Sequence, residues 1–130
     1  GLFVEHYQKN NVLWEADGGR TYMFQCEMAY DPPNQESWMD GDRRGYAAYK
    51  VADHVNTHEG WGLGAYCYFN KNPSVVADSG FQAPDKPGIR FHGLYTVPLA
   101  GTGTIQHIIN DTGSTARGPD TVPQYLEKYP

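Results

Sequence analysis

Short apolar and aromatic runs, separated by clusters of turn-forming residues, are the feature of this sequence that most restricts its fold. Gly, Pro, Asn and Asp fill the segments between the runs, as in "ADGG", "DPPNQ" and "APDKPG". Aromatic and β-branched residues favour strands, and Gly and Pro end them. The pattern predicts an all-β protein, although "GYAAYKVADHV" (45–55) also fits one short helix. The strand-like runs are 2–8, 11–16, 20–30, 45–52, 63–70, 73–78, 89–99 and 104–110.

The charge balance limits the ligands that this chain can bind. Its net charge is −5 over 130 residues, and only 19% of the residues are charged. Nucleic-acid binding needs a basic stripe that releases counterions, and none is present. The many tyrosines and tryptophans suit an uncharged, hydroxyl-rich ligand better. We therefore expect no nucleic-acid partner.

The sequence contains no segment that predicts membrane insertion. No apolar run approaches the roughly 20 residues of a membrane-spanning helix, and no signal peptide is recognisable. The first residue is Gly1, and strand-like sequence follows at once. That start suggests a fragment or a processed chain, and a mature secreted protein fits the same description.

One glutamate lies inside the apolar run "FQCEMAYDPP" (24–33), which an Asp-Pro-Pro sequence ends. Successive side chains of a strand point to opposite faces. Counting along 20–30 places Tyr22, Phe24, Cys26 and Met28 on one face, and Met23, Gln25 and Glu27 on the other. Glu27 is therefore expected to leave the core.

A second glutamate, Glu5, lies between Phe3 and Tyr7 on one face of the first run. Glu5 and Glu27 are 22 residues apart, which is roughly one coil of a parallel β-helix. In that architecture they lie on adjacent rungs, and splayed side chains can then separate the two carboxyls by about 6.5–9.5 Å. Inverting glycosidases use this separation to admit a water. A half-exposed edge carrying a solvated charge is the alternative.

The other residues that could bind a ligand or react predict little on their own. Cys26 and Cys67 form no metal motif, and both point inward by strand phase, so either a disulfide or two buried thiols fits. We expect no metal site and no cofactor, because "HVNTHE" (54–59) lacks the helical zinc pattern. Surface or capping histidines are expected there, and "LAGTGTI" (99–105) predicts a turn. Asn110 begins a glycosylation sequon.

Several segments together resemble glycoside hydrolase family 55, namely "EHYQ", "WEADGGRTYMFQCEMAYDPP", "GYAAYKVADHVNTHEGWGLGAYCYF", "PGIRFHGLYTVPL" and "IQHIIN". The resemblance covers about residues 3–110, in the same order as in the C-terminal part of the family. It implies a secreted, inverting exo-β-1,3-glucanase built from two right-handed parallel β-helices, with this chain supplying later coils of the second. Residues 1–110 would form that β-helix portion. The three prolines of "RGPDTVPQYLEKYP" predict that the remaining residues, 111–130, form an irregular tail.

The resemblance also implies roles for individual residues. Glu27 corresponds to the general acid, Glu5 to the glutamate that helps to activate the water, and Tyr30 to an aromatic residue of a sugar subsite. The partners would be β-1,3-glucan and the N-terminal portion of the same enzyme, without which this chain should be inactive.

Two other interpretations also fit the sequence. The chain could be a carbohydrate-binding β module that uses Trp14, Trp38, Trp61 and tyrosines as platforms. It could also be a structural fragment that only completes a larger fold and is poorly soluble alone.

Overall fold

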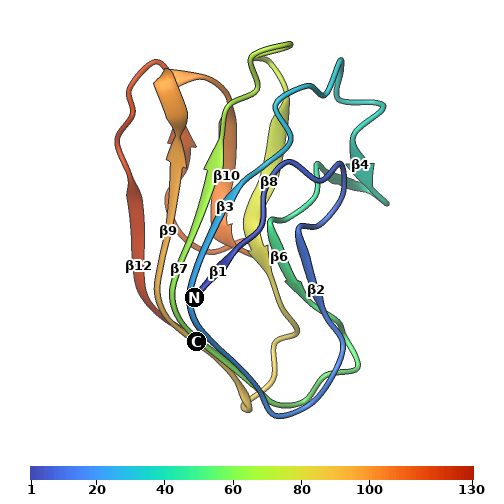
Figure 1. Ribbon diagram of the computed structural model, residues 1–130, viewed down its shortest axis with the longest axis vertical. Coiled ribbons are helices and arrows are strands. Elements are labelled where there is room, and N and C mark those ends of the chain that lie inside the picture. Colours follow the sequence, from blue (N-terminus) through green and yellow to red (C-terminus); the bar gives the residue numbers. More distant parts are fainter.

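Two five-stranded sheets face each other in the computed structural model, which describes residues 1–130 (Figure 1). We call the sheet with strand order β1-β3-β7-β9-β12 the long sheet, and the sheet with order β11-β10-β8-β6-β2 the short sheet. The strands of the long sheet are β1 (Leu2–Phe3), β3 (Gly19–Glu27), β7 (His58–Cys67), β9 (Ile89–Pro98) and β12 (Gln124–Tyr129). Those of the short sheet are β2 (Val12–Trp14), β6 (Tyr49–Val51), β8 (Val76–Gln82), β10 (Thr104–Ile109) and β11 (Ala116–Arg117).

The chain winds repeatedly from one sheet to the other. It passes from β2 to β3, from β6 to β7 and from β8 to β9, so each coil adds one strand to each sheet. Pairing is parallel within both sheets except at β11 and β12. This is the predicted parallel β-helix. The hairpin of β4 (Met39–Asp40) and β5 (Arg43–Arg44) projects from the second coil (Figure 1).

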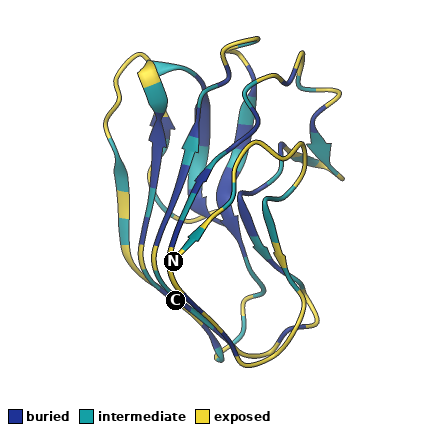
Figure 2. Ribbon diagram, viewed as in Figure 1, coloured by how far each residue is buried: buried dark blue, intermediate teal, exposed yellow.

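Apolar side chains stack between the two sheets. Phe24, Leu63 and Leu94 are aligned in register on successive strands of the long sheet, and all three are fully buried. Phe81 and Ile109 are likewise aligned and fully buried on β8 and β10 of the short sheet. Figure 2 shows the buried strands in the interior and the exposed residues mainly in loops and on β12. Each buried Phe or Leu contributes roughly 2 kcal/mol of hydrophobic stabilisation.

A row of left-handed residues interrupts the side-chain alternation of the long sheet. Met23, Gly62 and Gly93 have φ values of 62°, 66° and 69°, and they occupy the same position in β3, β7 and β9. We call these three residues the left-handed row. The conformation interrupts strand alternation, so Tyr22 and Met23 both point outward before Phe24 turns inward. The prediction that Tyr22 faces the core is therefore wrong.

The remaining differences from the expected strands also have local causes. No α-helix forms in 45–55, where β6 and a loop lie instead. Strand β7 begins at His58 rather than at Leu63, because parallel pairing with β3 and β9 continues through its glycines. The chain has no helix of the length and apolarity needed to cross a bilayer.

The tail contains more regular structure than its sequence indicated. Residues 111–130 were expected to be irregular, yet β11 and β12 lie within them. Strand β12 pairs antiparallel with β9, and β11 pairs antiparallel with β10. Both strands cover the edge of the last coil, which would otherwise present unpaired backbone groups. The turn predicted at 99–105 is confirmed as the short 3-10 helix η1 (Leu99–Gly101) and its exit.

Candidate active site

Glu5 and Glu27 lie side by side on adjacent rungs of the long sheet. The pairing of Leu2 with Phe24 sets a register that continues beyond β1. The backbone N–H of Val4 donates to Gln25 O at 3.3 Å, and that of His6 donates to Glu27 O at 2.9 Å. Neighbouring strands are about 4.8 Å apart. The predicted adjacency of the two glutamates is therefore present.

Two donors hold one oxygen of the Glu27 carboxyl. The Tyr30 hydroxyl donates to Oε2, and His6 Nε2 lies 3.2 Å from the same atom. The His6 and Tyr30 rings also contact each other, with centroids 4.4 Å apart. No hydrogen bond within the chain involves Oε1 of Glu27. The carboxyl is thus fixed through one oxygen, while the other is free for a ligand.

The Tyr30 phenol is protonated at neutral pH and remains a hydrogen-bond donor. Its bond to Glu27 is the main cause that raises the pKa of Tyr30 to about 12, followed by partial burial and the negative charges of Glu27 and Glu5. Ionising the phenol would remove the donor and bring another negative charge beside the carboxylates. Tyr30 therefore serves the site as a neutral O–H group.

Tyrosines form the wall beside the carboxyls. Tyr66 is the neighbour of Glu27 on β7, and its hydroxyl lies 3.0 Å from that of Tyr95 on β9. Burial is the main cause that raises the pKa of Tyr66, and the bond to Tyr95 adds to it. The Tyr95 ring lies over Gly64, where an added Cβ would be 2.3 Å from the ring. Only glycine leaves room for this ring.

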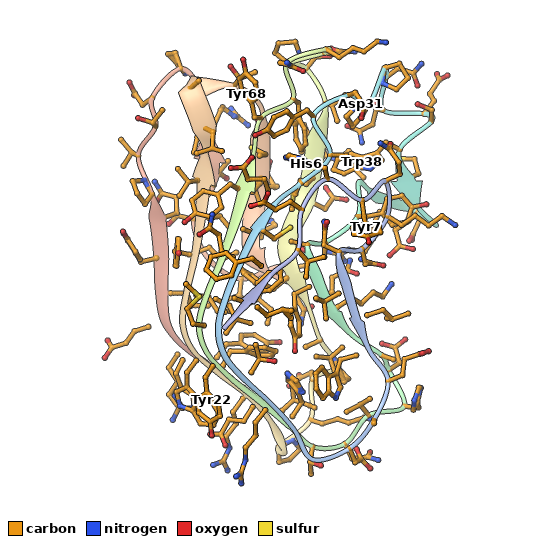
Figure 3. All side chains as sticks on the ribbon, viewed as in Figure 1. His6, Tyr7, Tyr22, Asp31, Trp38 and Tyr68 are labelled. Atoms are coloured by element: carbon orange, nitrogen blue, oxygen red, sulfur yellow. The ribbon has the colours of Figure 1, made fainter.

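Two loops support the upper end of the site. The loop after β1 carries His6 and Gln8, and the loop after β3 carries Tyr30 and Asp31. Gln8 Nε2 donates to Asp31 at 3.0 Å, which ties the loops together. The Tyr68 ring contacts the edge of Tyr30, with centroids 4.9 Å apart. Figure 3 shows His6, Asp31 and Tyr68 toward the upper end of the molecule, far from Tyr22 at the lower left.

The sequence predicted part of this arrangement and missed the rest. Glu5, Glu27 and Tyr30 come together as expected. His6, Tyr66 and Tyr68 were not singled out, although all three contact or adjoin them. Strand phase could have identified Tyr66, because alternation places it with Gly64 on the face that points away from the core. No local signal shows that His6 turns outward.

The two cysteines are free thiols. Cys26 is aligned with Ala65 and Cys67 with Pro98, so the thiols are offset along the strands as well as between rungs. Burial raises the pKa of Cys67 to about 12 and raises that of Cys26 as well. Neither thiol can act as a nucleophile, and the disulfide alternative does not apply.

The histidines of the 54–59 segment are structural. His58 is buried and not at the surface as expected, and its Nε2 lies 2.9 Å from the Tyr49 hydroxyl. Burial lowers the pKa of His58 to about 4. His54 Nε2 contacts Glu15 O at 2.9 Å, and Glu59 pairs with His92 at 3.0 Å. No group of three or more ligand-type side chains that could hold a metal occurs in the chain.

The Asn110 side chain forms hydrogen bonds within the fold. Its Nδ2 donates to Ala83 O at 2.9 Å and to the Tyr129 hydroxyl at 2.8 Å, while Oδ1 accepts from Ala83 N at 3.1 Å. An N-linked glycan replaces one hydrogen of this amide. This arrangement and glycosylation of Asn110 therefore exclude each other.

Two of the three tryptophans do not form open sugar platforms. Trp38 is buried, and its Nε1 donates to Gln8 O at 2.8 Å. The Trp14 ring packs against His58 at 4.9 Å between centroids. Trp61 is stacked between Tyr22 and His92 at 4.7 and 5.4 Å, so neighbouring rings occupy both of its faces. A sugar packs on a ring face, and neither Trp38 nor Trp61 offers one.

Comparison with known proteins relates this geometry to an enzyme. A family model described as the LAM55 pectate lyase-like domain matches residues 1–27. Over all 130 residues the chain is 52% identical to an exo-β-1,3-glucanase of Streptomyces sp. (strain SirexAA-E / ActE), of which it covers 22%. The structure matches that of sacteLam55A from Streptomyces sp. SirexAA-E with a TM-score of 0.98, covering 24% of that chain.

Over its whole length the chain resembles sacteLam55A and the exo-β-1,3-glucanase of the same organism. The resemblance to glycoside hydrolase family 55 and the β-helix fold are thereby confirmed. A second structure, a glutamate-to-alanine variant of sacteLam55A in complex with glucose, matches with the same TM-score and 51% identity, again over 24% of its chain. The chain spans about a quarter of the length of these relatives.

Proposed function

We propose that this chain is the part of an exo-β-1,3-glucanase that carries the general acid. The observation behind the proposal is the Glu27 carboxyl, held through Oε2 by Tyr30 and His6 beside a second carboxylate, Glu5. An exo-β-1,3-glucanase is identical to this chain at about half of the aligned positions, and a solved structure from the same organism has the same fold. Most glycosidases act through two neighbouring carboxyl groups.

The proposed reaction is an inverting hydrolysis. Glu27 donates its proton to the glycosidic oxygen while the bond from that oxygen to C1 breaks. Glu5 orients the water that attacks C1 from the opposite face and helps to take its proton. The remaining contacts to that water come from the N-terminal portion of the enzyme, which makes that portion the partner of this chain. β-1,3-Glucan of the laminarin type is the proposed substrate.

We further propose that the enzyme acts outside the cell. A β-glucan polymer is too large and too polar to cross a bilayer, so an enzyme that hydrolyses it must meet it there. Activity in the culture medium and none in washed, lysed cells is the expected result. Activity confined to the lysate would contradict secretion.

The test is Glu27→Gln in the full-length protein, assayed by glucose release from laminarin. General acid catalysis contributes about 10²–10⁴-fold, so kcat should fall by roughly a thousandfold. Glu59→Gln is the matched control, because Glu59 is another half-buried glutamate of the long sheet, placed away from the site. It should leave kcat within about twofold.

The stereochemistry of the first product tests inversion separately. An NMR spectrum recorded early in the reaction should show α-glucose accumulating before mutarotation. Near-normal glucose release by Glu27→Gln would remove the assignment of Glu27. Early β-glucose would leave the acid in place but overturn inversion.

A further inference from the structure

His6 holds the Glu27 segment from two directions. Its backbone N–H donates to the Glu27 carbonyl at 2.9 Å, and its Nε2 lies 3.2 Å from Glu27 Oε2. The ring also packs against Tyr30, the other donor to Oε2. One residue thus contacts the backbone of the general acid, its carboxyl group and the second residue that orients it.

An unusual backbone conformation places the His6 ring at this position. Val4 packs toward the core and Glu5 points outward, so simple alternation would turn residue 6 inward. Instead, His6 has a φ of 61°, in the left-handed region that few residues other than glycine adopt. The turn brings its side chain to the same face as Glu5 and Glu27. Strain of this kind concentrates at functional sites.

The donors divide the two oxygens of the carboxyl between different tasks. Both Tyr30 and His6 approach Oε2, while Oε1 has no partner in the chain. An oxygen that already accepts two hydrogen bonds has little capacity left to carry an acidic proton. The proton of Glu27 is therefore directed to Oε1, the oxygen that is free to face the substrate.

We propose that His6 is a positioning residue for the general acid, which keeps Oε2 occupied and presents the proton on Oε1 to the glycosidic oxygen. This inference rests on the proposed function of Glu27. In the reaction the O–H bond at Oε1 breaks, an O–H bond forms at the leaving oxygen, and the electron pair of the C1–O bond goes to that oxygen. His6 keeps its own proton throughout and only donates a hydrogen bond.

Other ionisable groups surround the carboxyl and are unchanged by substitution of His6. Glu5 lies on the adjacent rung, Tyr66 on the opposite one, and Tyr30 in the loop above, with Tyr68 behind it. Tyr30 and Tyr66 stay protonated because the pKa of each is raised. A change in pH dependence on removing His6 therefore reports the lost donor itself.

The experiment compares His6→Gly with His6→Gln in the full-length enzyme acting on laminarin. Glycine adopts the left-handed conformation freely, so His6→Gly removes the ring and keeps the turn. We expect kcat to fall by roughly 10- to 100-fold with little change in KM, as is typical of a misplaced catalytic group. The alkaline limb of the kcat profile should move to higher pH, because the carboxylate form has lost a donor.

His6→Gln supplies the rescue, since its amide N–H can reach the same oxygen. It should recover most of kcat and return the alkaline limb toward its original pH. If His6→Gly fails to fold, His6→Asn takes its place, because Asn tolerates the left-handed region and is too short to reach Oε2. The same losses are expected of it.

Three results would overturn the inference. These are an unchanged kcat and pH profile in His6→Gly, a rise in KM alone, and no recovery in a well-folded His6→Gln. If Glu27→Gln is inactive while His6→Gly is normal, only the role of His6 fails. If Glu27→Gln is active, the proposed function itself fails.

Discussion

The long sheet presents aromatic residues to solvent on both sides of the left-handed row, but the two groups are organised differently. Below the row, Tyr22, Trp61 and His92 stack face to face. Above it, Tyr66 and Tyr95 meet edge on through their hydroxyls, beside the half-exposed carboxyl of Glu27. The lower rings cover one another's faces, whereas the upper hydroxyl and carboxyl groups leave polar atoms available to a ligand. Aromatic content alone therefore does not identify a sugar site.

The left-handed row separates these two regions. Below it, the inward residues of β3 are Gly19 and Thr21, and above it they are Phe24 and Cys26. A single residue of left-handed conformation in each strand shifts the alternation by one position. The same sheet can then bury polar side chains at one end and expose a pair of glutamates at the other.

The largest expected effect concerns His58, which lies beneath the lower region. The Tyr49 hydroxyl is within hydrogen-bond distance of both Thr21 Oγ1, at 2.7 Å, and His58 Nε2, at 2.9 Å. His58 is neutral in the folded state because burial lowers its pKa from 6.5 to about 4. The unfolded chain therefore binds more protons between these two pH values.

Stability should accordingly fall as the pH falls from 6.5 to 4, by up to about 3 kcal/mol from this group. Chemical denaturation of the protein that contains this chain, at a series of pH values, measures the slope. His58→Leu should make that slope shallower. An equal slope in both proteins would show that His58 is not held neutral by the fold.

A second prediction contrasts the outer stack with the tyrosine wall. Trp61→Ala removes two stacked ring contacts and should lower the free energy of unfolding by about 2 kcal/mol, with kcat on laminarin nearly unchanged. Tyr66→Phe should do the reverse, lowering activity while costing less than about 1 kcal/mol of stability. Thermal midpoints and kcat of both variants give the comparison. A Trp61→Ala enzyme that is stable but inactive would assign the stack to substrate binding.

The smallest effects concern the left-handed row itself. An added Cβ at Gly62 meets no atom within 4 Å, so Gly62→Ala tests backbone conformation alone. It should cost about 1 kcal/mol, because alanine disfavours φ near 66°. Met23→Gly should gain up to about the same amount at the equivalent position of β3. Thermal midpoints that move in the same direction for both variants would contradict this account.

Much of the fold could be read from local patterns. Alternating apolar residues around Glu27 predicted that its side chain leaves the core. Turn clusters predicted where most strands of the two sheets lie, but both ends to within one residue only for β9 and β10. The 22-residue spacing of Glu5 and Glu27 matched the register of β1 with β3. The other coils differ in length, so no uniform repeat was available to predict their register.

The sequence by itself determined an all-β chain whose Glu27 points outward, because side-chain alternation is a property of each strand alone. Only the tertiary structure decided the phase shift at Met23, the outward turn of His6, the separation of the two thiols and the engagement of Asn110. Each of these depends on hydrogen bonds or packing with a neighbouring coil, and the partner residues lie tens of positions away along the chain.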